Sequence, residues 1–119
     1  MKEVKDNIVR SKSFDFALLI IQLFKNMQQE KEYVLSKQIL RSGTSIGANI
    51  EEASAAISKK DFIAKMSISA KEARETLYWL KLVEKSELVK IDVSELLEKS
   101  EELIRILTSI VKTSQNSNR

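Results

Sequence analysis

The 119-residue chain is 43% hydrophobic and 31% charged, a composition typical of one folded domain with a single core. It contains no cysteine and no histidine, which excludes disulfides, thiolate or imidazole metal ligands and histidine-dependent nucleophilic catalysis. The net charge of +3 permits nucleic-acid binding without requiring it.

The scarcity of helix breakers predicts an all-α fold. Proline is absent and there are only two glycines, too few to punctuate a set of strands and hairpins. The longest apolar run, residues 16–21, is far shorter than the roughly 20 residues that span a bilayer. The N-terminal segment mixes charges of both signs, so neither export nor membrane insertion is predicted, and the lack of cysteine fits a cytoplasmic protein.

The first predicted helix covers residues 13–31 and follows an N-terminal tail of residues 1–12. Ser13 is the expected N-cap, and Asp15 lies in the first turn, where a carboxylate suits the helix dipole. The apolar face of this helix has helical spacing and consists of Phe16, Leu19, Ile20, Leu23, Phe24 and Met27.

The second predicted helix, residues 32–57, keeps a helical apolar stripe although it holds both glycines of the chain. The stripe consists of Leu35, Ile39, Ile46, Ile50 and Ala53. Gly43 and Gly47 lie inside it, and each should cost about 1 kcal/mol relative to alanine.

With Ser42 and Ala48, the two glycines give this helix an unusually bare face. We interpret that face as a place of close helix packing, within the bundle or between subunits. The other interpretation is close backbone approach by a phosphate or another ligand. GTSIG is not a Walker motif, because no Lys-Ser/Thr pair follows the second glycine, and it does not open a helix after a strand.

The third predicted helix covers residues 58–85 and the fourth covers residues 92–112. Ser58 and Asp61 resemble a capping box, and Asp92 followed by Glu95 marks the fourth helix in the same way. A polar C-terminal tail, residues 113–119, is expected to follow. The short connections predict antiparallel neighbours, and therefore an up-down-up-down four-helix bundle over residues 13–112.

Tyr78 and Trp79 lie in a run, residues 77–82, that is apolar nearly all round the helix. Both rings cannot face the core, so at least one is predicted to be exposed or to lie in a contact between subunits. An ordinary position at the edge of the core and base stacking with a nucleic acid are the two other interpretations.

The third helix carries most of the excess positive charge, with seven basic against four acidic side chains in residues 58–85. Alternating charges usually indicate a solvated helix face. The alternative is salt-dependent contact with phosphates. The candidate residues for that contact are Lys59, Lys60, Lys65 and Lys71, together with Arg10 and Lys12 of the tail.

Four glutamates, Glu51, Glu52, Glu72 and Glu75, are predicted to form ion pairs with neighbouring cations such as Lys71. An all-carboxylate Mg or Mn site built from Glu51 and Glu75, which would make a metal-dependent enzyme, is the less favoured alternative. Arg41, beside the bare face, is expected to pair with a glutamate in a buried or intersubunit contact.

Two blocks of the sequence, SKQILRSGTSIGANIEEA and DFIAKMSISAKEARETLYWLKLVEK, resemble the bacterial proteins encoded by intervening sequences of 23S rRNA genes. The resemblance implies an antiparallel four-helix bundle that assembles into a homopentameric ring. A related branch comprises the accessory proteins of diversity-generating retroelements, basic pentamers that associate with nucleic acid. Some members carry a ribosomal-protein label that rests on gene context, and the family offers no catalytic residues to carry over.

The sequence therefore predicts a non-enzymatic oligomeric bundle, a scaffold or an RNA-associated binding module. It needs no cofactor, metal or small-molecule substrate, and its expected partners are further copies of itself and RNA. The alternative is an accessory of the ribosome or of rRNA processing with specific RNA contacts.

Overall fold

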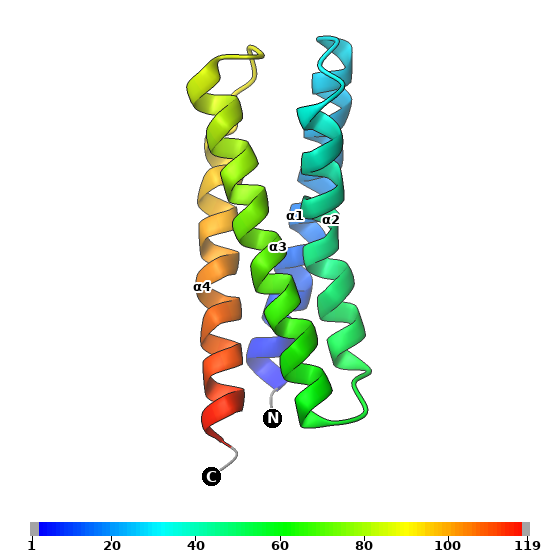
Figure 1. The fold of residues 1–119 in the computed structure, drawn as a ribbon, viewed down its shortest axis with the longest axis vertical. Helices are drawn as coiled ribbons and strands as arrows, with labels where there is room; N and C mark the ends of the chain where they lie inside the picture. The colour runs from blue at the N-terminus through cyan, green and yellow to red at the C-terminus, as the bar shows by residue number, and fades with distance from the viewer. Residues whose placement is uncertain (1–2, 118–119) are drawn as a thin grey trace.

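Four α-helices make up the computed structural model, which describes residues 3–117 and their side chains from residue 6 onward. The helices are α1 (Glu3–Gln29), α2 (Leu35–Ser54), α3 (Lys59–Ser86) and α4 (Ser94–Asn116). They run alternately up and down a rod of 50 × 21 × 20 Å (Figure 1). The α1–α2 and α3–α4 connections lie at one end, and the α2–α3 connection lies at the other. The predicted all-α four-helix bundle is confirmed.

Each helix packs against the next one along the chain, and α4 returns to α1 to close the bundle. The α2–α3 contact is the most extensive and the α1–α4 contact the slightest, while the described Cα atoms of the two diagonal helix pairs all lie more than 8 Å apart. No helix in the described part of the chain is both long enough and apolar enough to cross a membrane.

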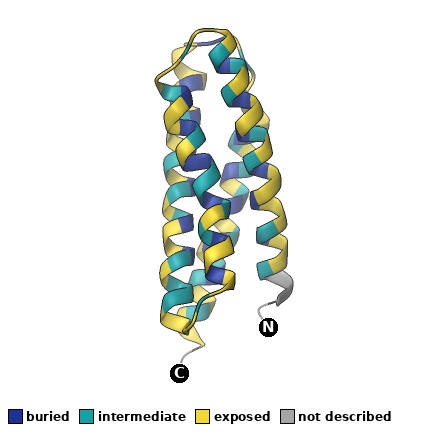
Figure 2. Ribbon diagram, turned by 90° about the vertical axis from the view of Figure 1, so that its right-hand side faces the viewer, coloured by how far each residue is buried: buried dark blue, intermediate teal, exposed yellow. Residues whose placement is uncertain are grey.

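The core runs the length of the rod between the helices, as the inward-facing buried positions in Figure 2 show. It contains most of the apolar stripes predicted for the first two helices, although Leu19, Phe24 and Leu35 are only half-buried. Six hydroxyl side chains are buried with it: Ser13, Ser36, Ser42, Ser69, Thr76 and Ser100. Ser69 donates across the bundle to the Ile46 carbonyl at 2.8 Å, which satisfies a buried polar group where α3 approaches α2.

The first helix begins ten residues earlier than predicted, so residues 3–12 are helical and do not form a tail. Ser13 is not an N-cap. It is buried inside α1, where its hydroxyl donates to the Arg10 carbonyl. The reason is visible in the sequence, because Val9 continues the buried stripe one turn before Ser13 and no glycine or proline interrupts the helix.

The second helix begins at Leu35 and not at Glu32, because Glu32 acts as its cap from outside. The carboxylate of Glu32 accepts hydrogen bonds from the backbone N–H groups of Val34, Leu35 and Ser36 at 3.1, 3.0 and 2.7 Å. These donors are among those that a helix start leaves without intrahelical partners. Val34, the residue directly before the helix, has no capping side chain of its own.

The ends of α3 and α4 fit the predicted caps only in part. Ser58 is the N-cap of α3, and its hydroxyl accepts the Asp61 N–H at 3.0 Å. Asp92 lies one residue before the cap position of α4 and accepts the Ser94 N–H at 2.9 Å. The fourth helix continues to Asn116, so residues 113–116 belong to the bundle and not to a tail.

Candidate nucleic-acid interface

The two glycines of α2 lie against α1. A Cβ atom placed on Gly43 would lie 2.7 Å from Cγ1 of Ile20, and one on Gly47 would lie 3.3 Å from Oγ of Ser13. Gly43 is buried in this contact. The two glycines therefore face a helix of the same chain, where α1 leaves almost no room for a side chain at Gly43.

The two small residues predicted beside the glycines lie on different sides of α2. Ser42 is buried toward α3, where its hydroxyl lies 2.8 Å from the hydroxyl of Thr76. Ala48 is exposed, so it takes no part in the packing that buries Gly43.

The adjacent rings of Tyr78 and Trp79 have different environments. Trp79 is half-buried against the core, and its Nε1–H donates to the Glu75 carboxylate at 3.0 Å. Tyr78 is 57% exposed, and its ring meets that of Trp79 edge-on, with centroids 5.3 Å apart. At least one ring was expected outside the core, and Tyr78 is that ring.

Arg41 links α2 to α3 through an ion pair within the chain. Its guanidinium contacts the carboxylates of Glu72, at 3.3 Å, and Glu75. The side chain of Arg41 is half exposed, so its ion pair with glutamate lies at the surface and is not a buried contact. Glu75 contacts Arg41 and Trp79, and it forms no ion pair with the predicted partner Lys71 in the described structure.

Glu51 and Glu52 form pairs elsewhere, with Arg10 at 2.9 Å and Lys65 at 3.1 Å. Glu51 follows Arg41 by ten residues on α2, about 15 Å along the axis, so its site is distant from that of Glu75. In the described part of the chain, no group of three or more potential ligands is arranged to hold a metal ion.

Most cations that we expected at phosphates are engaged within the chain. Besides the pairs of Arg10 and Lys65, Lys12 contacts Glu102 at 3.2 Å. Lys59 donates to the hydroxyl of Ser117. Lys60 and Lys71 are exposed and have no ion pair within residues 3–117.

A group of unpaired cations lies instead where α3 meets the second half of α4. We call it the α3–α4 basic face and define it as Lys71 and Arg74 of α3 with Arg105 and Lys112 of α4. Two adjoining open hollows lie on it, and no carboxylate is among the described residues that line them. All four cations are exposed, and none has an ion pair in the described structure.

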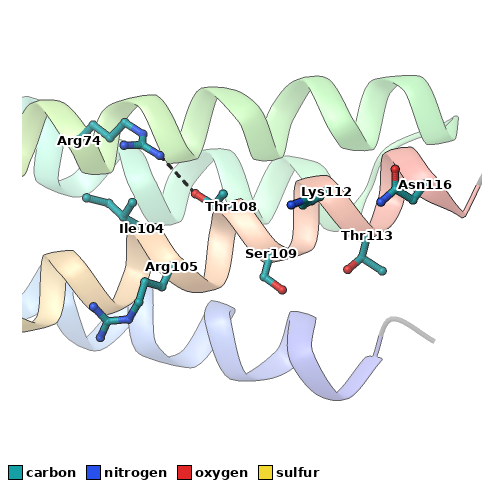
Figure 3. A pocket seen from close by; sticks show the side chains of 8 residues that line it. All are labelled: Arg74, Ile104, Arg105, Thr108, Ser109, Lys112, Thr113 and Asn116. Carbon is teal, nitrogen blue, oxygen red and sulfur yellow. Dashed lines mark hydrogen bonds between the residues drawn. The ribbon is translucent and has the colours of Figure 1, made fainter.

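Thr108 of α4 accepts a hydrogen bond from Arg74 of α3 and so links the two helices that form the basic face. Figure 3 shows Arg74 reaching from α3 to α4, where its Nη2 donates to the Thr108 hydroxyl at 3.4 Å. Arg105 precedes Thr108 by three residues and Lys112 follows it by four, so both belong to the same side of α4. Guanidinium, ammonium and hydroxyl groups are the donors that bind phosphate oxygens, and Arg74, Thr108 and Lys112 supply them here, whereas the Arg105 guanidinium points away from Arg74 in Figure 3.

Sequence reasoning identified Lys71 and missed the other three members of this face. Residues 86–119 hold slightly more acidic than basic side chains, so their net charge alone does not indicate a basic face on α4. The seven-residue spacing of Arg105 and Lys112 was the available signal, because it places two cations two turns apart on one side of a helix.

The sequence model of the family described as 23S rRNA-intervening sequence protein matches residues 5–109. Among solved structures, the chain is similar to a protein of unknown function of the S23 ribosomal protein family from Bacteroides thetaiotaomicron VPI-5482, with 49% identity and a TM-score of 0.87. The match covers 92% of this chain and 99% of that one. A search of curated proteins gives no significant match.

Proposed function

Because this chain belongs to the 23S rRNA-intervening sequence protein family, we propose that it is a non-enzymatic, oligomeric bundle that associates with RNA through its α3–α4 basic face. The observation that carries the proposal is the unpaired state of Lys71, Arg74, Arg105 and Lys112 in hollows without a carboxylate. Cations that stabilise the fold have acidic partners, as Arg10 and Lys65 do. A cluster without them favours an anion from outside the chain.

Removal of two cations from the basic face should weaken RNA binding and reduce its salt dependence. We expect the Arg105→Gln/Lys112→Gln variant to lower the slope of log affinity against log salt by roughly 1.5, since each lost phosphate contact contributes roughly 0.7 to 0.9. The measurement is fluorescence anisotropy of a labelled 23S rRNA fragment between low and physiological salt.

The matched control is Lys25→Gln/Lys37→Gln, which removes the same charge from exposed positions of α1 and α2. If both double variants lose the same affinity, general charge explains binding and the basic face is not the site. Weak binding at low salt by the unmodified protein, with no response to salt, would refute RNA association itself.

Assembly is the second part of the proposal, and the exposed side of α1 supports it. Phe14, Leu18 and Ile21 are 65%, 53% and 42% exposed. Their spacings of four and three residues place them on one stripe of the helix. A contiguous apolar stripe on a surface is typical of a protein–protein contact. We therefore propose that this stripe is buried in a homo-oligomer, a pentamer by resemblance to the family.

A charge on the α1 stripe should dissociate the oligomer without unfolding the chain. We expect Leu18→Glu to reduce the mass measured by light scattering to that of a monomer, because a buried unpaired carboxylate disfavours the contact. The circular dichroism spectrum should stay helical, since Leu18 is exposed within the single chain. Ile57→Glu is the control, because Ile57 is 95% exposed in the α2–α3 connection. A monomeric mass for the unmodified protein would contradict the proposal.

A further inference from the structure

We infer that the ligand of this surface is a single-stranded RNA whose bases stack on Tyr78; this inference rests on the proposed RNA association. Base stacking on an aromatic ring would add to the phosphate contacts of the basic face. Such stacking requires single-stranded and not double-stranded RNA.

Tyr78 lies within a row of cations on the outer side of α3. Lys71 and Arg74 precede it by seven and four residues, and Lys81 and Lys85 follow it by three and seven. Residues at these spacings share one side of a helix. All four are exposed, and none forms an ion pair within residues 3–117. The row spans about 21 Å of helix and continues the α3–α4 basic face past Tyr78.

The ring of Tyr78 contacts that of Trp79 and is otherwise largely accessible to solvent. Trp79 meets it edge-on at a centroid distance of 5.3 Å, yet 57% of Tyr78 stays exposed. Trp79 is itself held by its hydrogen bond to Glu75, and Glu75 is held by Arg41. A tyrosine side chain has only two rotatable bonds, so it loses little freedom when a base stacks on it.

The combination of ring and cations favours a single strand over a duplex. In double-stranded RNA the bases are stacked on one another and paired, so a ring on the outside of a helical rod meets only backbone and groove edges. In a single strand the base faces are accessible, and basic surfaces with exposed aromatic rings are how proteins bind such strands.

A second copy of this chain fits the same surface less well. A contact that buried Tyr78 would also remove nearby cations such as Arg74 and Lys81 from water, which is unfavourable unless carboxylates meet them. The α1 stripe carries no such cost at Phe14, Leu18 and Ile21, because these side chains are apolar. An acidic peptide would match the charge but would leave the ring of Tyr78 without a role.

The test compares a labelled, unstructured 20-nucleotide RNA with the same sequence in a duplex, by fluorescence anisotropy at fixed salt. We expect Tyr78→Ala to weaken binding of the single strand roughly 5- to 150-fold and to leave duplex binding unchanged. Tyr78→Phe should retain the affinity, because it keeps the ring. Tyr33→Ala is the control, since Tyr33 is 49% exposed at the α1–α2 connection.

Trp79 provides an independent readout because it is the only tryptophan and lies beside Tyr78. Its emission should change on addition of the single strand and stay unchanged on addition of the duplex. Absence of RNA binding in any form would refute the proposed function and this inference together. Binding of single strand and duplex with equal affinity, unaffected by Tyr78→Ala, would leave RNA association intact and overturn the stacking.

Two further outcomes would overturn this inference while leaving other parts of the proposal in place. If polyglutamate displaces the RNA when both are present at equal concentration, the surface binds any acidic polymer. A change of oligomer mass in Tyr78→Ala would place Tyr78 in a contact between subunits.

Discussion

Replacement of Gly43 by alanine is expected to destabilise the bundle, although alanine is the better helix former. The added Cβ would lie 2.7 and 2.9 Å from two γ carbons of Ile20, closer than carbon atoms can approach. Ile20 is fully buried and β-branched, so it cannot rotate away. Overpacking of this kind costs about 1–3 kcal/mol, which exceeds the roughly 1 kcal/mol gained in helix propensity. Leucine at Gly43 should cost more.

Gly47→Ala is the matched control, because it makes the same chemical change four residues along the same helix. Its Cβ would lie 3.3 Å from the Ser13 hydroxyl, a contact that a small shift relieves. The gain in helix propensity then offsets the crowding, so Gly47→Ala should be near neutral. The free energies of unfolding of both variants are measured by urea denaturation and compared with that of the unmodified protein. Equal stabilities for the two variants would contradict close packing at Gly43.

Removal of the Glu32 side chain should lower the free energy of unfolding by about 1–2 kcal/mol near neutral pH, the usual effect of a lost N-cap. In Glu32→Ala, three backbone N–H groups at the start of α2 lose their acceptor. Glu98→Ala is the control, since Glu98 is exposed on α4. The free energies of unfolding of Glu32→Ala and Glu98→Ala are measured by urea denaturation at pH 7.

The effect of Glu32 should disappear in acid. Partial burial acts to raise the pKa of its carboxyl group, but the backbone hydrogen bonds from Leu35, Ser36 and Val34 outweigh it and lower the pKa below the ordinary value of a glutamate. A carboxyl group with a lowered folded-state pKa stabilises the fold above its unfolded pKa and loses that contribution as the pH falls through the folded value. The stability difference between the native protein and Glu32→Ala should therefore narrow below about pH 4.5. A difference that is constant down to pH 2 would exclude the charge as its source.

The helices and their order were predictable from the sequence because apolar residues recur at helical spacing throughout. The ends were less predictable. The start of α1 was placed at Ser13 because serine is a common N-cap, yet the buried Val9 extends the stripe and the helix simply continues. At α2 the cap is supplied by Glu32, three residues before the helix, a geometry that depends on the fold of the preceding turn.

The basic face was less predictable than the fold, because pairing between helices decides which cations are free. Arg10 and Lys65 were equivalent to Lys71 in the sequence, but the alignment of α2 with α1 and α3 gives them carboxylate partners. The approach of Arg74 to Thr108 likewise depends on how α3 and α4 are aligned along the rod. Spacing within one helix is available from sequence, whereas the register between two helices is a product of core packing.

The helices contact one another mainly in chain order, and this arrangement favours rapid folding. Because α1 contacts α2, α2 contacts α3 and α3 contacts α4, nearly all tertiary contacts join segments that follow one another in synthesis. Such short-range topology is associated with fast folding. The slight α1–α4 contact joins the two ends of the chain, so it carries the largest loop-closure entropy of the four contacts between helices.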